Sequence, residues 1–209
     1  MRRLDAPLQV ANALDEAAQS GQIWNWMNMH PDHAEFRMFE RWTAGPPDAP
    51  LPTPTADFGI NCWEIPLYFA VRTGQLTHTD LARFYPPPRD SSGVVADRWF
   101  RRDLLRGLSP GGVVLYRPDD RDSLQPTIGD FGYMHSEEYP IQHVVVFAEN
   151  VRPGATRSPM VYSFMNFETL GPGPAQVVRV PFDEVYEQSK ERMREDTPIT
   201  SASFGRGPW

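Results

Sequence analysis

Cysteine is almost missing from this sequence: Cys62 is the only one among 209 residues. A single cysteine cannot close a disulfide within the chain, and a zinc site built on cysteine needs several of them. The sequence therefore excludes a disulfide scaffold and a cysteine-based zinc module. It indicates no metal and no cofactor, and it leaves the role of Cys62 as the main question.

Long apolar runs and an excess of positive charge are missing as well. No window approaches the roughly 18 apolar residues of a membrane span, and Asp5, Asp15 and Glu16 interrupt the segment in which a signal peptide would lie. We therefore expect a soluble chain, cytoplasmic or exported by a route without a visible signal, unless the sequence is a piece of a longer protein. The formal charge of −7 argues against a protein that binds nucleic acid by neutralising phosphates.

Hydrophobic residues are plentiful, at 40% of the chain, and aromatic residues make up 12%. This is enough material for the core of one domain. The first 43 residues show helical spacing of apolar residues and a proline-rich stretch follows, so residues 1–56 are predicted to form a helical arm and a connector. Residues 57–196 are predicted to form the core, and residues 197–209 a loose tail.

The second half of the chain is typical of strands. Four runs rich in β-branched and aromatic residues are bounded by glycine, proline, asparagine or aspartate. They span residues 111–117, 141–149, 159–167 and 175–181. Consecutive strands of this kind predict an antiparallel meander, and helices followed by strands predict an α+β fold.

Cys62 lies in the stretch GINCWEIPLYFAVRTG (59–74), where a run with helical spacing begins. Proline is not tolerated deep in a helix, so Pro66 predicts a helix that begins near Glu64 or has a distorted first turn. The unpaired amide groups at a helix start favour the thiolate form of a cysteine. Such a thiolate can attack a carbonyl carbon, with the amide of Cys62 as one donor to the oxyanion.

A nucleophilic cysteine needs a base, and His143 is the best candidate. It lies in IQHVVVFAE, a strand that is apolar on both faces and is therefore predicted to be buried. The alternative is a core histidine whose ring is satisfied by hydrogen bonds. His135, expected in a loop, is a weaker candidate for the base. The remaining histidines are expected at surface, capping or turn positions: His30, His33 and His78.

The order of these features resembles the NlpC-type papain-like superfamily: a helix-starting cysteine, a strand introduced by SPGG, and a strand that begins with histidine. This superfamily includes cell-wall peptidases, CHAP-type amidases, acyltransferases and toxin deamidases. The resemblance covers roughly residues 57–180 and implies a cysteine-bearing helix packed on an antiparallel sheet of about four to five strands. It makes Cys62 the nucleophile and His143 the base of a papain-like catalytic core. The sequence departs from the pattern at Gly112, where the family has an acid, and at Trp63, where it has a small residue.

The residue that orients His143 has several candidates. Family position implies Ser163, whereas Asn166 offers an amide oxygen that can accept the imidazole N–H. These two residues are three apart in a predicted strand and point to opposite faces, so only one of them can serve. Glu168 becomes a candidate if the strand bulges.

Three neighbours of Cys62 are candidates for substrate binding. Asn61 either caps the helix or donates to an oxyanion. Glu64 either stabilises the helix dipole or orients the substrate, and Trp63 is the third candidate. The expected substrates are peptides, peptidoglycan or proteins.

Two functions are compatible with this sequence. The first is a thiol hydrolase that acts on amide bonds through Cys62 and His143, as a peptidase, an amidase or a protein-glutamine deamidase of bacterial effector or toxin type. The second is a non-catalytic binding or structural protein with an inert buried cysteine, because free cysteines are among the most buried residues. In either case the N-terminal helices are candidates for contact with a protein partner.

Overall fold

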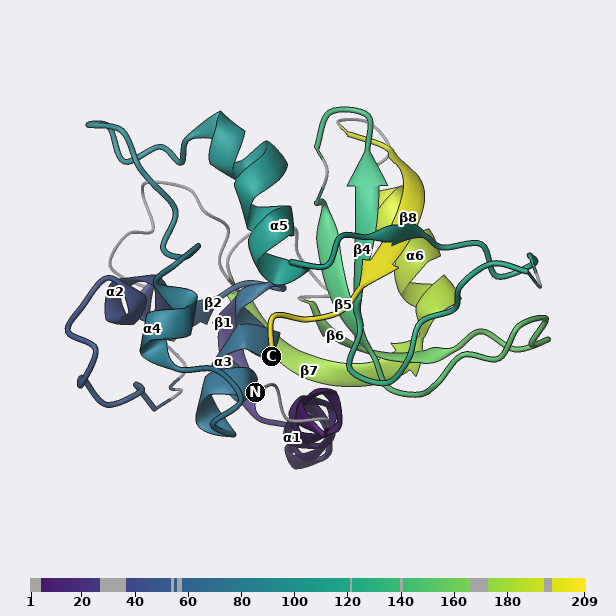
Figure 1. Cartoon of the computed structure of the whole chain (residues 1–209), viewed down its shortest axis with the longest axis horizontal. Coiled ribbons are helices and arrows are strands. Elements are labelled where there is room, and N and C mark those ends of the chain that lie inside the picture. The colour runs from purple at the N-terminus through teal and green to yellow at the C-terminus, as the bar shows by residue number, and fades with distance from the viewer. Residues whose placement is uncertain are drawn as a thin grey trace.

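The computed structural model of the chain is organised around one sheet (Figure 1). It describes residues 5–26, 37–53, 55, 58–120, 122–139, 141–165, 173–193 and 197–209. The eight strands run in the order β2-β1-β7-β6-β5-β4-β8-β3 across the sheet. Their bounds are β1 (Ile23–Trp26), β2 (Gly59–Ile60), β3 (Val114–Leu115), β4 (Phe131–Ser136), β5 (His143–Phe147), β6 (Met160–Met165), β7 (Gly173–Pro181) and β8 (Ile199–Gly205).

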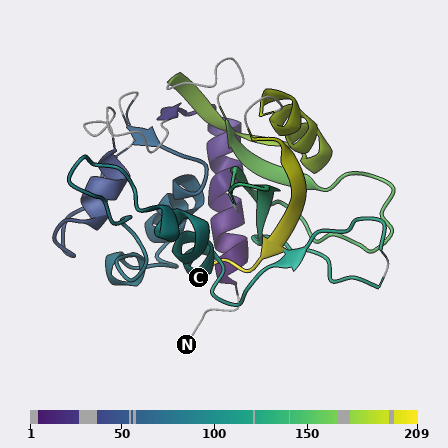
Figure 2. The same cartoon turned by 90° about the horizontal axis from the view of Figure 1, so that it is seen from above.

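Helices cover both faces of this sheet. They are α1 (Ala6–Ser20), α2 (Met38–Thr43), α3 (Glu64–Arg72), α4 (His78–Leu81), the π-helical turn η2 (Trp99–Asp103), α5 (Leu104–Leu108), which continues η2, and α6 (Phe182–Arg192). Helices α1 and α6 both contact β6 and β7, and Figure 2 shows them on opposite sides of β7. None of the helices in the described part of the chain is long and apolar enough to cross a membrane.

Alternation along the strands divides the buried side chains between two cores. The first core lies between the sheet and helices α1, α3 and α5, and it contains Val144 and Val146 of β5. The second core lies under α6 and contains Val145 and Phe147. Because successive residues of a strand point to opposite faces, the position of a residue along β5 decides which core its side chain joins.

The prediction of an antiparallel sheet with about four to five strands is wrong. The sheet has eight strands, and the parallel pairing of β1 with β2 makes it mixed. Strand β1 lies in the region predicted to be helical, where buried Trp24 follows exposed Ile23 with the period of two that a half-buried strand requires. Strand β8 lies in the predicted loose tail, and it pairs with both β4 and β3.

Both ends of the described chain are held against the sheet. Asp15 of α1 accepts a hydrogen bond of 2.9 Å from the hydroxyl of Tyr162 on β6. At the other end the ring of Trp209 packs on Phe131 of β4, with ring centroids 5.1 Å apart. The segments predicted as arm and tail thus supply α1, β1, α2 and β8 to the same sheet and cores.

Candidate functional site

The turn that carries Cys62 is fixed by reciprocal capping. The side-chain oxygen of Asn61 accepts hydrogen bonds from the backbone N–H groups of Trp63 at 3.2 Å and Glu64 at 3.0 Å. The Glu64 carboxylate in turn accepts the backbone N–H of Asn61 at 2.9 Å. This capping box satisfies three amide groups at the helix start. Helix α3 is regular from Glu64, which places Pro66 at its third residue, where proline is tolerated.

Cys62 is a core residue. Its side chain is 4% exposed and belongs to the first core. Burial raises the pKa of the thiol to about 12, and this outweighs the backbone N–H groups of Val144, Cys62 and Trp63, which act in the opposite direction. The thiol is therefore protonated at neutral pH, and the expectation of a thiolate at the helix start is not met. Removal from water has the larger effect on the sulfur.

His143 is the first residue of β5, and its ring contacts β6. Its Nε2 lies 2.9 Å from the hydroxyl of Ser163, within hydrogen-bonding distance. The side chain is buried, and burial lowers the pKa of the imidazole to about 4, with the charge of Arg192 on α6 adding to this shift. The imidazole is therefore neutral at physiological pH.

Cys62 and His143 lie on opposite faces of the sheet. Cys62 belongs to the same core as Val144 and Val146. His143 and Val145 are two residues apart in β5, so their side chains point to the same face, that of the second core. His143 also pairs with Met134, a second-core residue of β4, and the charge of Arg192 on α6 acts on its ring. The backbone of β5 thus separates the two side chains, and no hydrogen bond joins them within the described residues. The structure brings the predicted base to Ser163 and not to the predicted nucleophile.

The other predicted residues divide into two groups. Asn166 and Glu168, the alternatives to Ser163, lie outside the described residues, and so do His30 and His33. His78, in contrast, lies at the start of α4, where its Nε2 is 3.1 Å from the carbonyl oxygen of Trp42. This contact gives His78 a place in the packing of α4 against α2.

Trp63 and Glu64 point into the protein. The Trp63 ring meets Phe100 edge-on, with ring centroids 5.7 Å apart. The Glu64 carboxylate accepts the hydroxyl of Tyr85 in addition to the amide of Asn61. Burial, reinforced by the charge of nearby Glu40, raises the pKa of Glu64 to about 7. Both side chains have structural contacts here, and neither is exposed for substrate binding.

A buried ion pair of Arg89 with Glu40 lies near the Glu64 carboxylate. Arg89 binds both carboxylate oxygens of Glu40, with two nitrogen–oxygen distances of 2.7 Å. Arg37 lies 3.7 Å from the same carboxylate. This cluster ties α2 to the loop that precedes η2. The sequence carries no sign of this cluster, because Arg89 and Glu40 are far apart in the chain and only the fold joins them.

A second histidine–serine contact lies on the first-core face. His135 is part of β4 and not of a loop, and its Nε2 is 2.6 Å from the hydroxyl of Ser203 on β8. Tyr133 stacks on the His135 ring at 6.4 Å between centroids, and its hydroxyl is 2.7 Å from that of Ser109. The only sequence signal for these partners is the alternation of Ser203 with apolar neighbours in β8, a segment predicted to be a tail.

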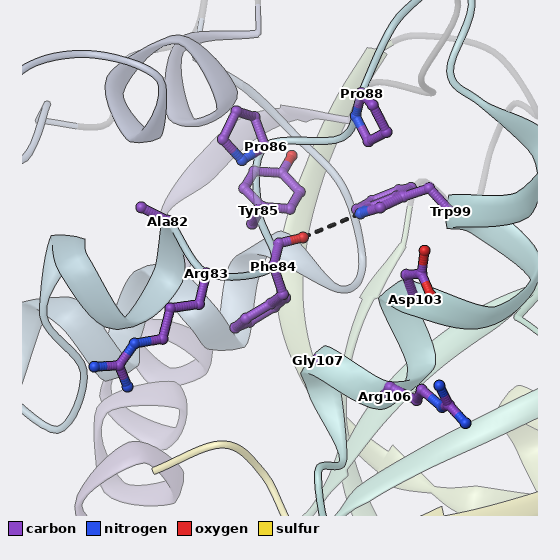
Figure 3. Close-up of a pocket in the computed structure, with 10 residues that line it drawn as sticks. All are labelled: Ala82, Arg83, Phe84, Tyr85, Pro86, Pro88, Trp99, Asp103, Arg106 and Gly107. Carbon is purple, nitrogen blue, oxygen red and sulfur yellow. Dashed lines mark hydrogen bonds between the residues drawn. The ribbon is translucent and has the colours of Figure 1, made fainter.

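A surface groove opens between the segment 82–88, which follows α4, and the η2–α5 helix (Figure 3). Its volume is about 510 Å³, and its wall combines the rings of Phe84 and Trp99 with the charged side chains of Arg83, Asp103 and Arg106. The indole N–H of Trp99 donates to the carbonyl oxygen of Phe84 at 3.0 Å, which fixes one side of the groove.

Gly107 lines this groove opposite Phe84. A Cβ atom at this position would lie 2.2 Å from the ring of Phe84, so only glycine lets the helix approach that closely. The groove could not be predicted from the sequence, because its two sides come together only where Phe84 packs against Trp99 and Gly107.

Within the described residues, no group of three or more histidine, cysteine, aspartate or glutamate side chains is arranged to hold a metal ion. Comparison of the chain with protein-family models, curated proteins and solved structures finds no match. The geometry of the chain's own residues is therefore the basis for assigning a function.

Proposed function

We propose that this chain is a non-catalytic binding protein in which Cys62 is an inert core residue. The observation that carries the proposal is the separation of Cys62 from His143 by the backbone of β5. Thiol catalysis needs a nucleophile and a base within hydrogen-bonding reach. Here burial favours the protonated thiol, and the ring nitrogen Nε2 of His143 contacts Ser163 and not Cys62.

The groove between segment 82–88 and the η2–α5 helix is the proposed binding site. Its volume of about 510 Å³ is in the range of ligand sites, which span roughly 300–1,000 Å³. Such sites combine apolar walls with a few polar groups that orient the ligand. Phe84 and Trp99 provide the apolar walls, and Arg83, Asp103 and Arg106 provide the polar groups. In Figure 3 the guanidinium groups of Arg83 and Arg106 lie at the two outer edges of the lining and extend away from each other.

Alkylation of the thiol tests the proposal. We expect Cys62 to react with iodoacetamide at pH 7.5 only after unfolding in guanidinium, because both its burial and its raised pKa suppress the reactive thiolate. The matched control is the variant Cys62→Ala with Ser91→Cys, which moves the single cysteine to an exposed loop. That control should react in the folded state. Fast alkylation of Cys62 in the folded protein, slowed by His143→Ala, would overturn the proposal.

A thiol hydrolase is the second candidate, and one observation favours it. The hydrogen bond between His143 and Ser163 joins the base and the orienting group that the resemblance to papain-like hydrolases implies. In such an enzyme Cys62 would attack the carbonyl carbon of a peptide, peptidoglycan or protein amide, and the amine or ammonia would leave with a proton from His143. Water would then hydrolyse the thioester.

Mass spectrometry separates the two candidates. Casein and purified peptidoglycan, incubated with the protein, should remain unchanged if the chain only binds. Loss of a peptide bond or conversion of glutamine to glutamate, present with the wild type and absent with Cys62→Ala, would establish the hydrolase instead. The Ser163→Ala variant would then lower the rate of that reaction.

A further inference from the structure

Three arginines form a stripe along the η2–α5 helix. Residues 97–108 are continuously helical, and Arg98, Arg102 and Arg106 recur every four residues on it. This spacing places the three side chains on one face of a helix. All three are exposed. The pKa of Asp103 is lowered, first by its hydrogen bond with Arg102 and further by the charges of Arg98 and Arg106.

Positive charge dominates this stripe. Arg102 pairs with Asp103 at 2.9 Å, whereas neither Arg98 nor Arg106 has an ion pair within 4 Å among the described residues. Arg106 also lines the groove of Figure 3. A cationic surface of this kind stands out on a chain whose formal charge is −7. It is suited to an anionic partner.

The same chain carries the complementary surface on α6. Glu184, Glu187 and Glu191 recur at helical spacing and are exposed. They line a hollow of about 580 Å³ beside this helix, together with Lys190 and Pro198 among others. Lys190 pairs with Glu187 at 3.1 Å, which leaves an excess of negative charge along the stripe.

The two stripes match in length. Arg98 to Arg106 is eight residues and Glu184 to Glu191 is seven, so at about 1.5 Å per residue each stripe extends over roughly 10–12 Å. Helix α5 packs on the first core and α6 on the second, so the stripes lie on opposite sides of the sheet (Figures 1 and 2). One molecule therefore cannot close the contact on itself.

We propose that the arginine stripe docks the acidic face of α6 from a second copy of this chain. The hollow beside α6 admits the guanidinium groups between the glutamates, where paired carboxylates and arginines form charge-assisted hydrogen bonds. Because the two surfaces differ, the contact is head-to-tail and each dimer keeps one free surface of each kind. Association therefore continues beyond the dimer as the concentration rises.

The ionic strength decides how strong this contact is. Exposed ion pairs are weak individually. We therefore expect association to become measurable as the protein concentration is raised toward about 1 mM. At about 0.1 M salt the screening length is about 10 Å, which preserves contacts between the stripes and screens the repulsion between two chains of net charge −7. At about 1 M salt the screening length falls to about 3 Å, and the contact is lost.

Sedimentation velocity tests the proposal with three double variants. Arg102→Glu with Arg106→Glu makes both stripes acidic, and Glu187→Arg with Glu191→Arg makes both basic. Each should weaken self-association at 0.1 M salt at least about tenfold, because attraction becomes repulsion. Mixing the two should restore association between them. The control matched to the first variant is Arg117→Glu with Arg152→Glu, which makes the same charge change at exposed positions elsewhere and should leave self-association as in the wild type.

A wild-type protein that sediments as a monomer at every concentration in 0.1 M salt overturns the proposal. So does self-association that is unaffected by 1 M salt, or that the control weakens as much as the stripe variants do. All substituted residues are exposed, and a thermal melt of each variant verifies that the fold is intact. This test is independent of the thiol chemistry, since none of its variants changes Cys62, His143 or Ser163.

Discussion

The imidazole of His143 and the hydroxyl of Ser163 are 2.9 Å apart on the face of the sheet that packs against α6. Cys62 belongs to the core on the other face, next to the backbone of Val144. One step along β5 therefore separates a buried hydrogen-bonded histidine from the sulfur that it was predicted to activate. Because the side chains of a strand alternate, this step decides between a catalytic pair and two unrelated core residues.

The first prediction concerns the packing of Cys62. We expect Cys62→Ser to lower the free energy of unfolding by about 1–3 kcal/mol, because a hydroxyl is more costly to bury than a thiol. Cys62→Ala should cost less, since it leaves only a small cavity. Urea unfolding monitored by tryptophan fluorescence measures both. A serine variant as stable as the wild type would show that the sulfur is not in an apolar environment.

Local sequence patterns could predict most of the elements on which this argument depends. The runs at 141–149 and 159–167 contain strands β5 and β6, and the run at 175–181 covers all of β7 except its first two residues. Each pattern is long enough to show its own period. The effect of Pro66 on the start of α3 could also be predicted, because it is a local property of proline.

The pairing of distant segments could not be predicted in this way. Strand β1 is only four residues long, and its place in the sheet comes from β7, where Ile23 pairs with Gln176. The run IQHVVVFAE is apolar on both faces, so its pattern does not show which face His143 occupies. The pKa of Cys62 depends on how completely the fold removes the sulfur from water, and a helix start by itself does not reveal this.

The second prediction concerns Glu64 and pH. Its pKa rises from an ordinary 4.5 to about 7 in the folded state, so folding favours the protonated form. The resulting stabilisation is complete below about pH 4.5 and is lost as the pH rises to about 7, by about 3 kcal/mol at most. Glu64→Gln keeps an oxygen that can accept the backbone N–H of Asn61. It has no carboxyl group to ionise, so the loss of stability with rising pH disappears. We expect it to be more stable than the wild type at pH 8, as measured by urea unfolding.

Glu184→Gln is the control for that measurement, because Glu184 is exposed on α6. Its stability at pH 8 should stay within about 0.5 kcal/mol of the wild type, as is usual for surface substitutions. If Glu64→Gln were less stable than the wild type at pH 8, the buried carboxylate would be stabilising as an ion, and the argument from burial would be wrong.

The third prediction concerns His143, whose titration has the opposite sign. Burial lowers its pKa from an ordinary 6.5 to about 4, so folding favours the neutral ring. This stabilisation is complete above about pH 6.5 and is lost as the pH falls to about 4, again by about 3 kcal/mol at most. Glu64 and His143 therefore compensate each other in the wild type between pH 4 and 7.

Single substitutions should reveal these two opposed slopes. Glu64→Gln is expected to become more stable as the pH rises from 4 to 6.5, because the titration of His143 is then uncompensated. His143→Gln should become less stable over the same range. Urea unfolding at five pH values measures both. Equal slopes in the two variants would mean that neither group titrates as its burial requires.

The fourth prediction concerns the ion pair of Arg89 with Glu40, in which the two side chains are only 15% and 11% exposed. Arg89→Ala leaves the Glu40 carboxylate buried without this bidentate partner and is expected to cost about 3–5 kcal/mol. The pair Arg157–Glu149 is the matched control. Its nitrogen–oxygen distance, 2.8 Å, is similar, but its arginine side chain is 68% exposed. Arg157→Ala should cost about 1 kcal/mol or less, since exposed pairs contribute little. Thermal unfolding of both variants measures the contrast, and similar losses in the two would show that the Glu40 carboxylate reaches water once Arg89 is removed.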